Sequence, residues 1–184
     1  MILLLDAGFA NLGYAVVDPN SVKKPFELLE TGVIKTVRDK SLPSAHDSSN
    51  RVAELFRGLK QIAYRFELNA ICAEYPHGGA KSSSAIKAMS FASAVITCFA
   101  TSESVKLKIV SPMEVKKTIR PKGKVEKEEI MSNVSKIFPD YSFPKVKARY
   151  EHVADAISVG LALKKTGEWS NLACLDKYSC EVPF

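Results

Sequence analysis

Apolar residues follow two different periods along this chain, and the change from one to the other marks its elements. Short apolar runs bounded by turn residues are typical of buried strands, whereas apolar positions that recur every three to four residues are typical of helices. Strands are expected at 2–6, 12–17, about 26–36, 70–74 and 105–110. Helices are expected at 52–66, about 82–99, a short stretch from 112, 126–138 and 150–165. The polar segment 43–50 predicts a loop.

The order of these elements predicts the fold class. Three successive strands open the chain, strands then alternate with helices, and helices complete it. A meander of antiparallel strands followed by such alternation implies an α/β fold, a five-stranded mixed β-sheet flanked by α-helices. Residues 167–184 show no clear period. We therefore expect one domain over residues 1–166 and a C-terminal tail, 167–184, packed on its surface.

Composition narrows the class of protein. Hydrophobic residues make up 46% of the chain and charged residues 25%, as in an ordinary globular protein. The apolar stretches are shorter than the roughly 20 residues of a membrane helix, and the chain begins on a core strand without a secretory leader. We expect a cytoplasmic protein without membrane contact. No CxxC pair occurs, so reduced thiols are expected, although Cys174 and Cys180 could bridge or hold a metal.

Positive charge is concentrated in one part of the chain. The formal net charge is +6, and between Lys106 and Lys127 eight lysines and arginines accompany only two glutamates. Lys145, Lys147 and Arg149 form a second basic cluster. Such a stripe attracts polyanions, above all nucleic acid. A solvated lysine-rich face explains the charge equally well.

Acidic residues stand where burial makes a charge costly. Asp6 ends the first apolar strand and Glu74 ends another, and a carboxylate entering an apolar core must be paired, neutralised or bound to a metal. His152 and Asp155 are three residues apart, hence on one face of an otherwise apolar helix. Neighbouring strands lie about 4.8 Å apart, so acids at corresponding strand ends come within reach of one ion.

These four residues predict a catalytic metal site. Oxygen-rich ligand sets suit Mg²⁺ or Mn²⁺, and two such ions about 3.5–4 Å apart stabilise the attacking and leaving oxygens of a phosphoryl displacement. Together with the basic stripe, Asp6, Glu74, His152 and Asp155 indicate a nuclease. Each residue alone also fits a structural role at a strand end or in a helix's first turn. Gly8 and Gly13 fit either a tight hairpin or close approach of a phosphate.

The motifs resemble those of the RuvC-type Holliday junction resolvases, in small phage-like form, within the ribonuclease-H-like nuclease superfamily. Residues 5–17, LDAGFANLGYAVV, look like the family's first motif, and Glu74 matches the acid that ends its fourth strand. Residues 111–127 are similar to its basic segment. His152-Val153-Ala154-Asp155-Ala156 resembles its last motif, in which an acid or histidine precedes an aspartate by three residues. The resemblance covers residues 1 to about 165.

By that resemblance the fold is ribonuclease-H-like, and the protein is a homodimer that nicks two opposed strands of a four-way junction with two Mg²⁺ or Mn²⁺ ions. Residues 85–94 combine small residues with Met and Phe, as a twofold interface requires, although ordinary packing on the sheet explains them almost as well. The expected DNA contacts are Tyr75, His77, Lys81, Lys116, Lys117, Lys122, Lys124, Lys127, Lys147 and Arg149.

Two alternatives stay open, and a further one is disfavoured. Family members often place an aromatic residue after the fourth-strand acid to stack on an opened base, and here only Tyr75 or His77 could replace it. A nuclease that debranches flaps and forks is therefore a second hypothesis, and a non-catalytic DNA-junction-binding protein is a third. A sugar-kinase or actin-like ATPase with its phosphate loop at Asp6 to Gly13 would need two such halves, for which the chain is too short.

Overall fold

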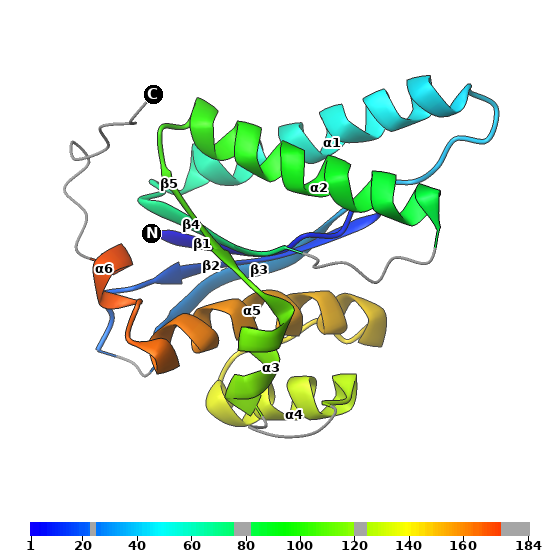
Figure 1. The fold of residues 1–184 in the computed structure, drawn as a ribbon. Helices are drawn as coiled ribbons and strands as arrows, with labels where there is room; N and C mark the ends of the chain where they lie inside the picture. Colours follow the sequence, from blue (N-terminus) through cyan, green and yellow to red (C-terminus); the bar gives the residue numbers. More distant parts are fainter. Residues whose placement is uncertain (23–24, 76–81, 120–124, 174–184) are drawn as a thin grey trace.

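The computed structural model describes residues 1–22, 25–75, 82–119 and 125–173, and within them five strands form one mixed sheet (Figure 1). The strands are β1 (Ile2–Asp6), β2 (Asn11–Asp18), β3 (Glu27–Lys35), β4 (Ala70–Glu74) and β5 (Lys106–Val110). The helices of the described residues are α1 (Ser44–Arg65), α2 (Ser83–Ser102), α3 (Pro112–Ile119), α4 (Lys127–Ile137), α5 (Lys147–Thr166) and α6 (Ser170–Ala173). The predicted fold class is confirmed.

Strand β1 lies at the centre of the sheet, whose order is β3-β2-β1-β4-β5. Its apolar residues 2–5 are fully buried, as the sequence predicts. It runs antiparallel to β2 and parallel to β4, and a parallel neighbour requires the long crossover that contains α1. The register pairs Asp6 with Gly13 on one side and with Glu74 on the other. Both predicted acids therefore emerge at the same edge of the sheet.

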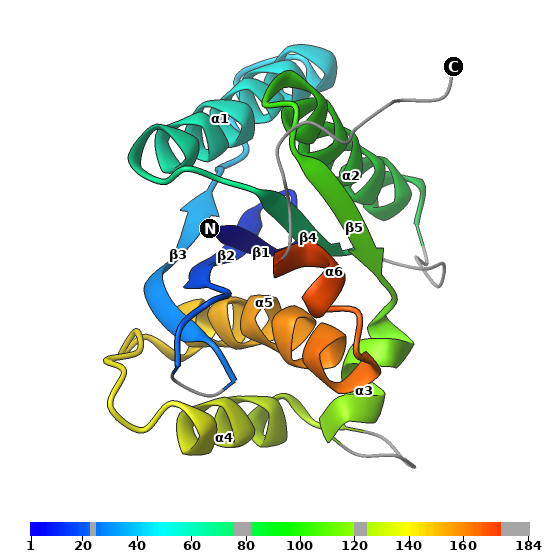
Figure 2. The ribbon, with the colours of Figure 1, turned by 90° about the vertical axis from the view of Figure 1, so that its left-hand side faces the viewer.

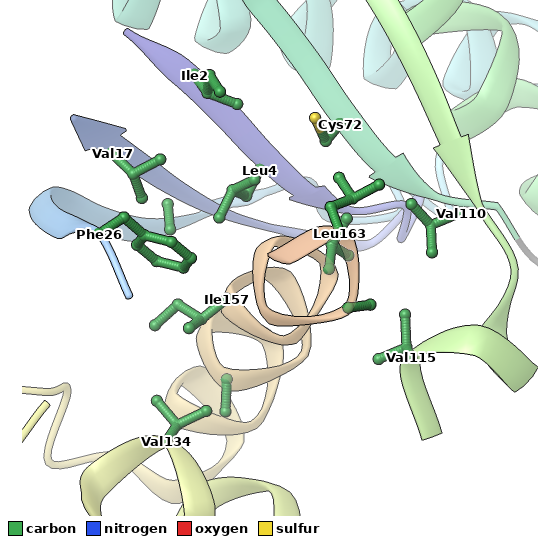
Figure 3. Packing of buried hydrophobic residues seen from close by; sticks show 14 of the residues in the cluster. Ile2, Leu4, Val17, Phe26, Cys72, Val110, Val115, Val134, Ile157 and Leu163 are labelled. Atoms are coloured by element: carbon green, nitrogen blue, oxygen red, sulfur yellow. The ribbon is translucent and has the colours of Figure 1, made fainter. Parts of the chain in front are cut away.

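Helices cover both faces of the sheet. Helices α1 and α2 pack on one face and α5 on the other, with α3 and α4 on the outer side of α5 (Figure 2). Because side chains alternate along a strand, Leu3 and Leu5 enter the cluster under α1 and α2. Leu4 enters the opposite cluster, which also contains Cys72 and Ile157 of α5 (Figure 3). Helix α5 is apolar on most sides because the sheet and two helices enclose it.

Residues 44–50 of the polar segment 43–50 are helical, so the predicted loop is wrong. Helix α1 begins at Ser44, and Asp47 in its first turn is buried. The Asp47 carboxylate accepts a hydrogen bond from the backbone N–H of Asp39 at 2.8 Å and lies 3.8 Å from the Arg51 guanidinium. These tertiary partners compensate the burial of a charge that the local pattern assigns to solvent. Helix α5 likewise begins at Lys147, three residues earlier than expected.

The start of the expected tail takes part in the core. Trp169 and Leu172 are buried, and the Trp169 ring stacks on Phe26 with 4.9 Å between ring centroids. Residues 174–184 lie outside the described residues. The boundary at residue 166 remains a prediction, but the chain just beyond it already covers one end of the α5 cluster.

Helix α2 is long and apolar enough to cross a membrane by length and composition alone, which the sequence pattern did not lead us to expect. In the structure it runs beside α1 over the sheet, with Ile96 and Phe99 fully buried. Only five of its residues are buried, Ala92, Val95, Ile96, Phe99 and Ala100, and Ile86 is 55% exposed. The exposed positions of α2 combine apolar and small residues, Ile86, Ala94 and Cys98, with the polar residues Lys87, Ser90, Thr97 and Thr101.

Candidate active site

Asp6 and His152 meet at the carboxyl end of β1. Asp6 is the last residue of β1, and His152 lies in the second turn of α5. The Nδ1 atom of His152 donates a hydrogen bond to Oδ2 of Asp6 over 2.9 Å, and the two side chains are 27% and 24% exposed. A carboxylate can only accept, so Nδ1 carries the proton. This bond raises the pKa of His152.

Two further carboxylates lie in the field of Asp6. Glu74 is its register partner on β4, and burial, followed by the charges of Asp6 and Asp155, raises the pKa of Glu74 to about 7. Asp155 lies one helical turn after His152, and burial, followed by the charge of Asp6, raises its pKa to about 6. The site therefore holds three acids that repel one another where water is partly excluded.

Two glycines let the backbone form this arrangement. A Cβ on Gly8 would lie 2.1 Å from the carbonyl oxygen of Asn11, and the Gly8 N–H donates to the carbonyl oxygen of Asp6 at 2.9 Å, so Gly8 serves the tight hairpin. A Cβ on Gly13 would lie 2.2 Å from the carbonyl oxygen of His152. Gly13 thus serves the close approach of α5 to the sheet, a reason that the sequence analysis did not consider.

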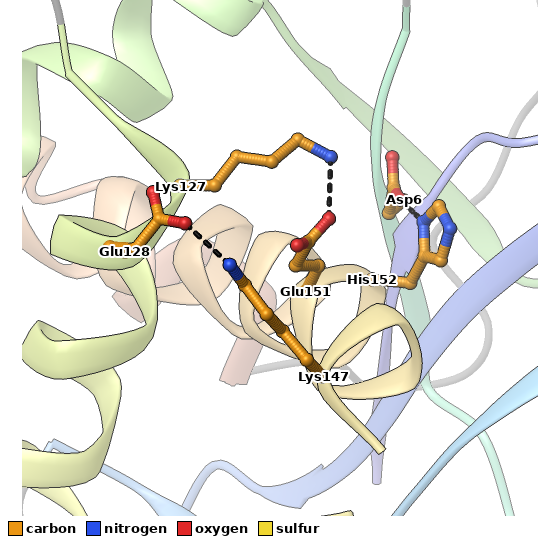
Figure 4. A network of polar contacts seen from close by, with 6 residues as sticks. All are labelled: Asp6, Lys127, Glu128, Lys147, Glu151 and His152. Carbon is orange, nitrogen blue, oxygen red and sulfur yellow. Dashed lines mark hydrogen bonds and ion pairs between the residues drawn. The ribbon is translucent and has the colours of Figure 1, made fainter.

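Lysines from two helices offset the negative charge. Against the dominant effect of burial, Lys116 of α3 lowers the pKa of Glu74, and Lys127 of α4 lowers that of Asp155. The Nζ atom of Lys127 also lies 2.9 Å from Oε2 of Glu151 in the first turns of α5 (Figure 4). Sequence reasoning missed Glu151. The sequence gives only a weak indication of a role for Glu151, namely a charged residue directly before His152 in a largely apolar helical stretch.

The donor set suits a divalent cation. Three carboxylates and one imidazole are ligands that Mg²⁺ or Mn²⁺ accepts. A cation would offset both the burial that chiefly raises the pKa values of Glu74 and Asp155 and the repulsion that adds to it. Among the residues that the structure describes, no three His, Cys, Asp or Glu side chains already form a coordination shell. Asp6 and His152 are bonded to each other, so an ion would have to replace that hydrogen bond.

The expected DNA contacts separate into three groups. Lys116 and Lys117 on α3, Lys127 on α4, and Lys147 and Arg149 on α5 are exposed, on the three helices packed at the α5 face of the sheet. Tyr75 instead faces α2, where its hydroxyl donates to the carbonyl oxygen of Ser93 at 2.9 Å, so the structure does not bring it to the carboxylates. The predicted contacts that lie outside the described residues are His77, Lys81, Lys122 and Lys124.

Comparisons with known proteins agree with this architecture. The family model described as crossover junction endodeoxyribonuclease RuvC matches residues 2–163. Proteins of that name from Natranaerobius thermophilus and Prochlorococcus marinus are 26% and 28% identical over 161 residues, which is 88% of this chain and 92% and 93% of theirs.

A solved structure extends the comparison to the fold. The structure of T. thermophilus RuvC in complex with a Holliday junction substrate superposes with a TM-score of 0.73 and covers 92% of this chain and 95% of that one, at 22% identity. At this identity the likeness concerns the fold. Since the family model spans the whole sheet and nearly all of α5, with the Asp6, Glu74, His152 and Asp155 cluster between them, this chain belongs to the crossover junction endodeoxyribonuclease RuvC family.

Proposed function

We propose that this protein is a divalent-metal-dependent endonuclease that resolves four-way DNA junctions by paired nicks in opposed strands. One observation carries the proposal: three carboxylates and an imidazole from β1, β4 and α5 gather at one edge of the sheet, beside exposed lysines. The names of the relatives and the junction bound to the structurally similar T. thermophilus protein support the same substrate class.

Asp6, Glu74, His152 and Asp155 would hold the metal, as two Mg²⁺ or Mn²⁺ ions. When bound, such ions supply an activated water and stabilise the leaving 3′-oxygen of a phosphodiester. Carboxylate oxygens suit either ion, and the imidazole of His152 suits Mn²⁺ as well as Mg²⁺. The partial burial of Glu74 and Asp155 strengthens the electrostatic interactions within the site, because little water screens them.

The exposed lysines would hold the DNA backbone. Lys116 and Lys127 lie close enough to the acids to influence the pKa values of Glu74 and Asp155. The positive charges of these lysines would offset the negative charge of a phosphate placed between them and the acids. Lys117, Lys147 and Arg149 would extend the contact along the strand. Phosphate contacts of this kind position the duplex arms without reading base sequence.

The second strand would be cut by a second copy of the chain. Helix α2 exposes Ile86 and several small residues, and an open cavity of about 370 Å³ lies between α1 and α2, lined by residues that include Val52 and Phe91. Pairing of two copies through α2 would set two active sites at a fixed distance, as paired nicking of a junction requires.

Nick mapping tests the proposal. Purified protein is incubated with end-labelled four-way, Y-shaped and linear duplexes, each with Mg²⁺, Mn²⁺ or EDTA. We expect metal-dependent nicks at symmetrical positions of two opposed strands of the four-way junction. Scattered nicks at every branch would instead indicate a debranching nuclease. Junction binding without nicking in either metal would contradict catalysis and support a DNA-binding protein.

A further inference from the structure

Two ion pairs join the start of α4 to the start of α5 (Figure 4). Lys127 of α4 pairs with Glu151 of α5 at 2.9 Å, and Glu128 of α4 pairs with Lys147 of α5 at 2.7 Å. The two pairs have opposite polarity and similar lengths. They therefore provide an internal comparison between a pair beside the site carboxylates and a more exposed pair between the same two helices.

The two pairs differ in surroundings. Both members of the Lys147–Glu128 pair are more than 60% exposed, and the pKa of Lys147 is raised chiefly by Glu128. Glu151 is only 20% exposed and directly precedes His152. The pKa of Lys127 is raised first by its bond to Glu151, and the charges of Asp155 and Asp6 add to the effect. The Lys127 ammonium thus lies in the field of the site acids.

The Lys127 ammonium needs a partner outside α4 to stay close to the site acids. It is the first residue of α4, where the helix dipole disfavours a positive charge. Its side chain is a flexible stem whose head group is strongly hydrated, and it is 58% exposed. Glu151 is carried by α5, the helix whose position on the sheet also fixes His152. The ion pair therefore holds the flexible Lys127 side chain against α5, the same helix that carries His152 and Asp155.

We propose that Glu151 is a positioning residue that holds the Lys127 ammonium beside the carboxylates, ready to bind an oxygen of the phosphate to be cut. The inference rests on the proposed nuclease function. A lysine ammonium has three N–H donors, so it can keep its bond to Glu151 and donate another to the phosphate. Glu151 acts through Lys127 and need not touch DNA.

Single-turnover cleavage of a four-way junction tests the inference with Glu151→Gln. The amide keeps the shape of the side chain and loses the charge that orders Lys127. The entropic cost of ordering one long side chain corresponds to a change in rate of about threefold to tenfold. We therefore expect the cleavage rate to fall by this factor at saturating concentrations of the junction. The junction Kd in EDTA should change less than about twofold, since Lys127 keeps its charge. Glu151→Asp should recover part of the rate.

Two variants separate positioning from simple linkage of the helices. Glu128→Gln breaks the neighbouring pair between the same helices and should cleave at the wild-type rate. Lys127→Ala should lose more activity than Glu151→Gln, and the double variant should lose no more than Lys127→Ala alone. A full cleavage rate for Glu151→Gln, an equal loss in Glu128→Gln, or multiplied losses in the double variant would each overturn the inference.

A measurement without DNA or metal keeps the inference separate from the proposed function. In nitrogen-15 NMR spectra of the free protein, a lysine ammonium held in an ion pair exchanges slowly enough to be seen. We expect a signal assigned to Lys127 that disappears in Glu151→Gln and persists in Glu128→Gln. If the wild-type protein nicks no junction, the proposed function is wrong. If the signal is the same in both variants, the positioning role is wrong whatever the activity.

Discussion

Gly13 of β2 lies directly against the backbone of His152 in α5, so close that a Cβ at position 13 would be 2.2 Å from the His152 carbonyl oxygen. Gly13 is also the register partner of Asp6. The missing side chain therefore sets how near α5 comes to the sheet, and through this the 2.9 Å hydrogen bond between His152 and Asp6. A residue with no chemistry of its own determines the geometry of the site.

Gly13→Ala should damage stability and cleavage together. The new methyl group must push α5 away from β2, and overpacking of this kind costs about 1–3 kcal/mol. A displacement near 1 Å at the site lowers cleavage by about a hundredfold. Urea unfolding measures the loss of stability. Junction cleavage is then compared under conditions in which the wild type and the Gly13→Ala protein are both folded.

Gly167→Ala is the matched control for this substitution. Gly167 caps the far end of α5 with φ of 79°, and no atom lies within 4 Å of an added Cβ. The left-handed backbone costs an alanine about 1–2 kcal/mol, so stability should fall while cleavage by the folded protein stays unchanged. Equal cleavage by the Gly13→Ala and Gly167→Ala proteins would show that the approach of α5 does not govern the site.

Asp6→Asn should abolish cleavage and leave junction binding largely intact. The amide keeps the size of the side chain but removes the charge that, in the proposed mechanism, holds the metal. Loss of one such electrostatic group costs about a hundredfold or more in rate. Binding should change less than about threefold, because the lysine contacts remain. Filter binding in EDTA and cleavage in Mn²⁺ measure both, with the exposed Asp140→Asn as control. Retained cleavage by the Asp6→Asn protein would refute the role of Asp6.

Lys116→Ala should weaken junction binding and reduce its salt dependence. Lys116 is exposed on α3 and close enough to Glu74 to lower its pKa, which places its charge beside the proposed path of the phosphate. Loss of one phosphate contact should reduce the slope of log Kd against log salt by about one. Lys60→Ala on α1, across the sheet, removes the same charge and serves as control. Equal slopes for the two variants would argue against a phosphate contact at Lys116.

The metal-free protein should lose stability as pH rises from about 4 to 7. The pKa of Glu74 rises from 4.5 to about 7 on folding and that of Asp155 from 3.8 to about 6, mainly through burial. The folded state therefore retains protons that the unfolded chain releases, so this destabilisation grows through that window and is constant above it. Below about pH 3 both carboxyls are protonated in the folded and the unfolded state, and the effect vanishes.

Glu74→Gln isolates this effect, because the amide cannot ionise. In EDTA it should unfold with a free energy higher than that of the wild type by on the order of 1–3 kcal/mol at pH 8, and with nearly the same value at pH 4.5. Added Mg²⁺ should stabilise the wild type more at pH 8 than at pH 5. Thermal unfolding across this pH series gives the comparison. A variant that is less stable than the wild type at every pH would contradict the assigned cause.

The sequence alone determined the elements and the candidate residues. The apolar runs at residues 2–5 and 71–73 could only be buried strands, and an acid at the end of each stood out because a buried charge needs a partner. Helical spacing put His152 and Asp155 on one face, and both interact with Asp6 in the structure. That these residues hold metal remains a prediction, as does the nuclease domain boundary.

The tertiary structure alone decided how these pieces meet. The local pattern did not reveal that Asp47 would be buried in a helix, that Tyr75 would face α2, or that Glu151 would hold Lys127. Each depends on a partner brought close by strand register or helix packing rather than by neighbours along the chain. Periodicity reports which side of an element is buried, because that depends on the element itself. It carries no information on the distance between two elements, which here is set by the closeness of Gly13 to α5.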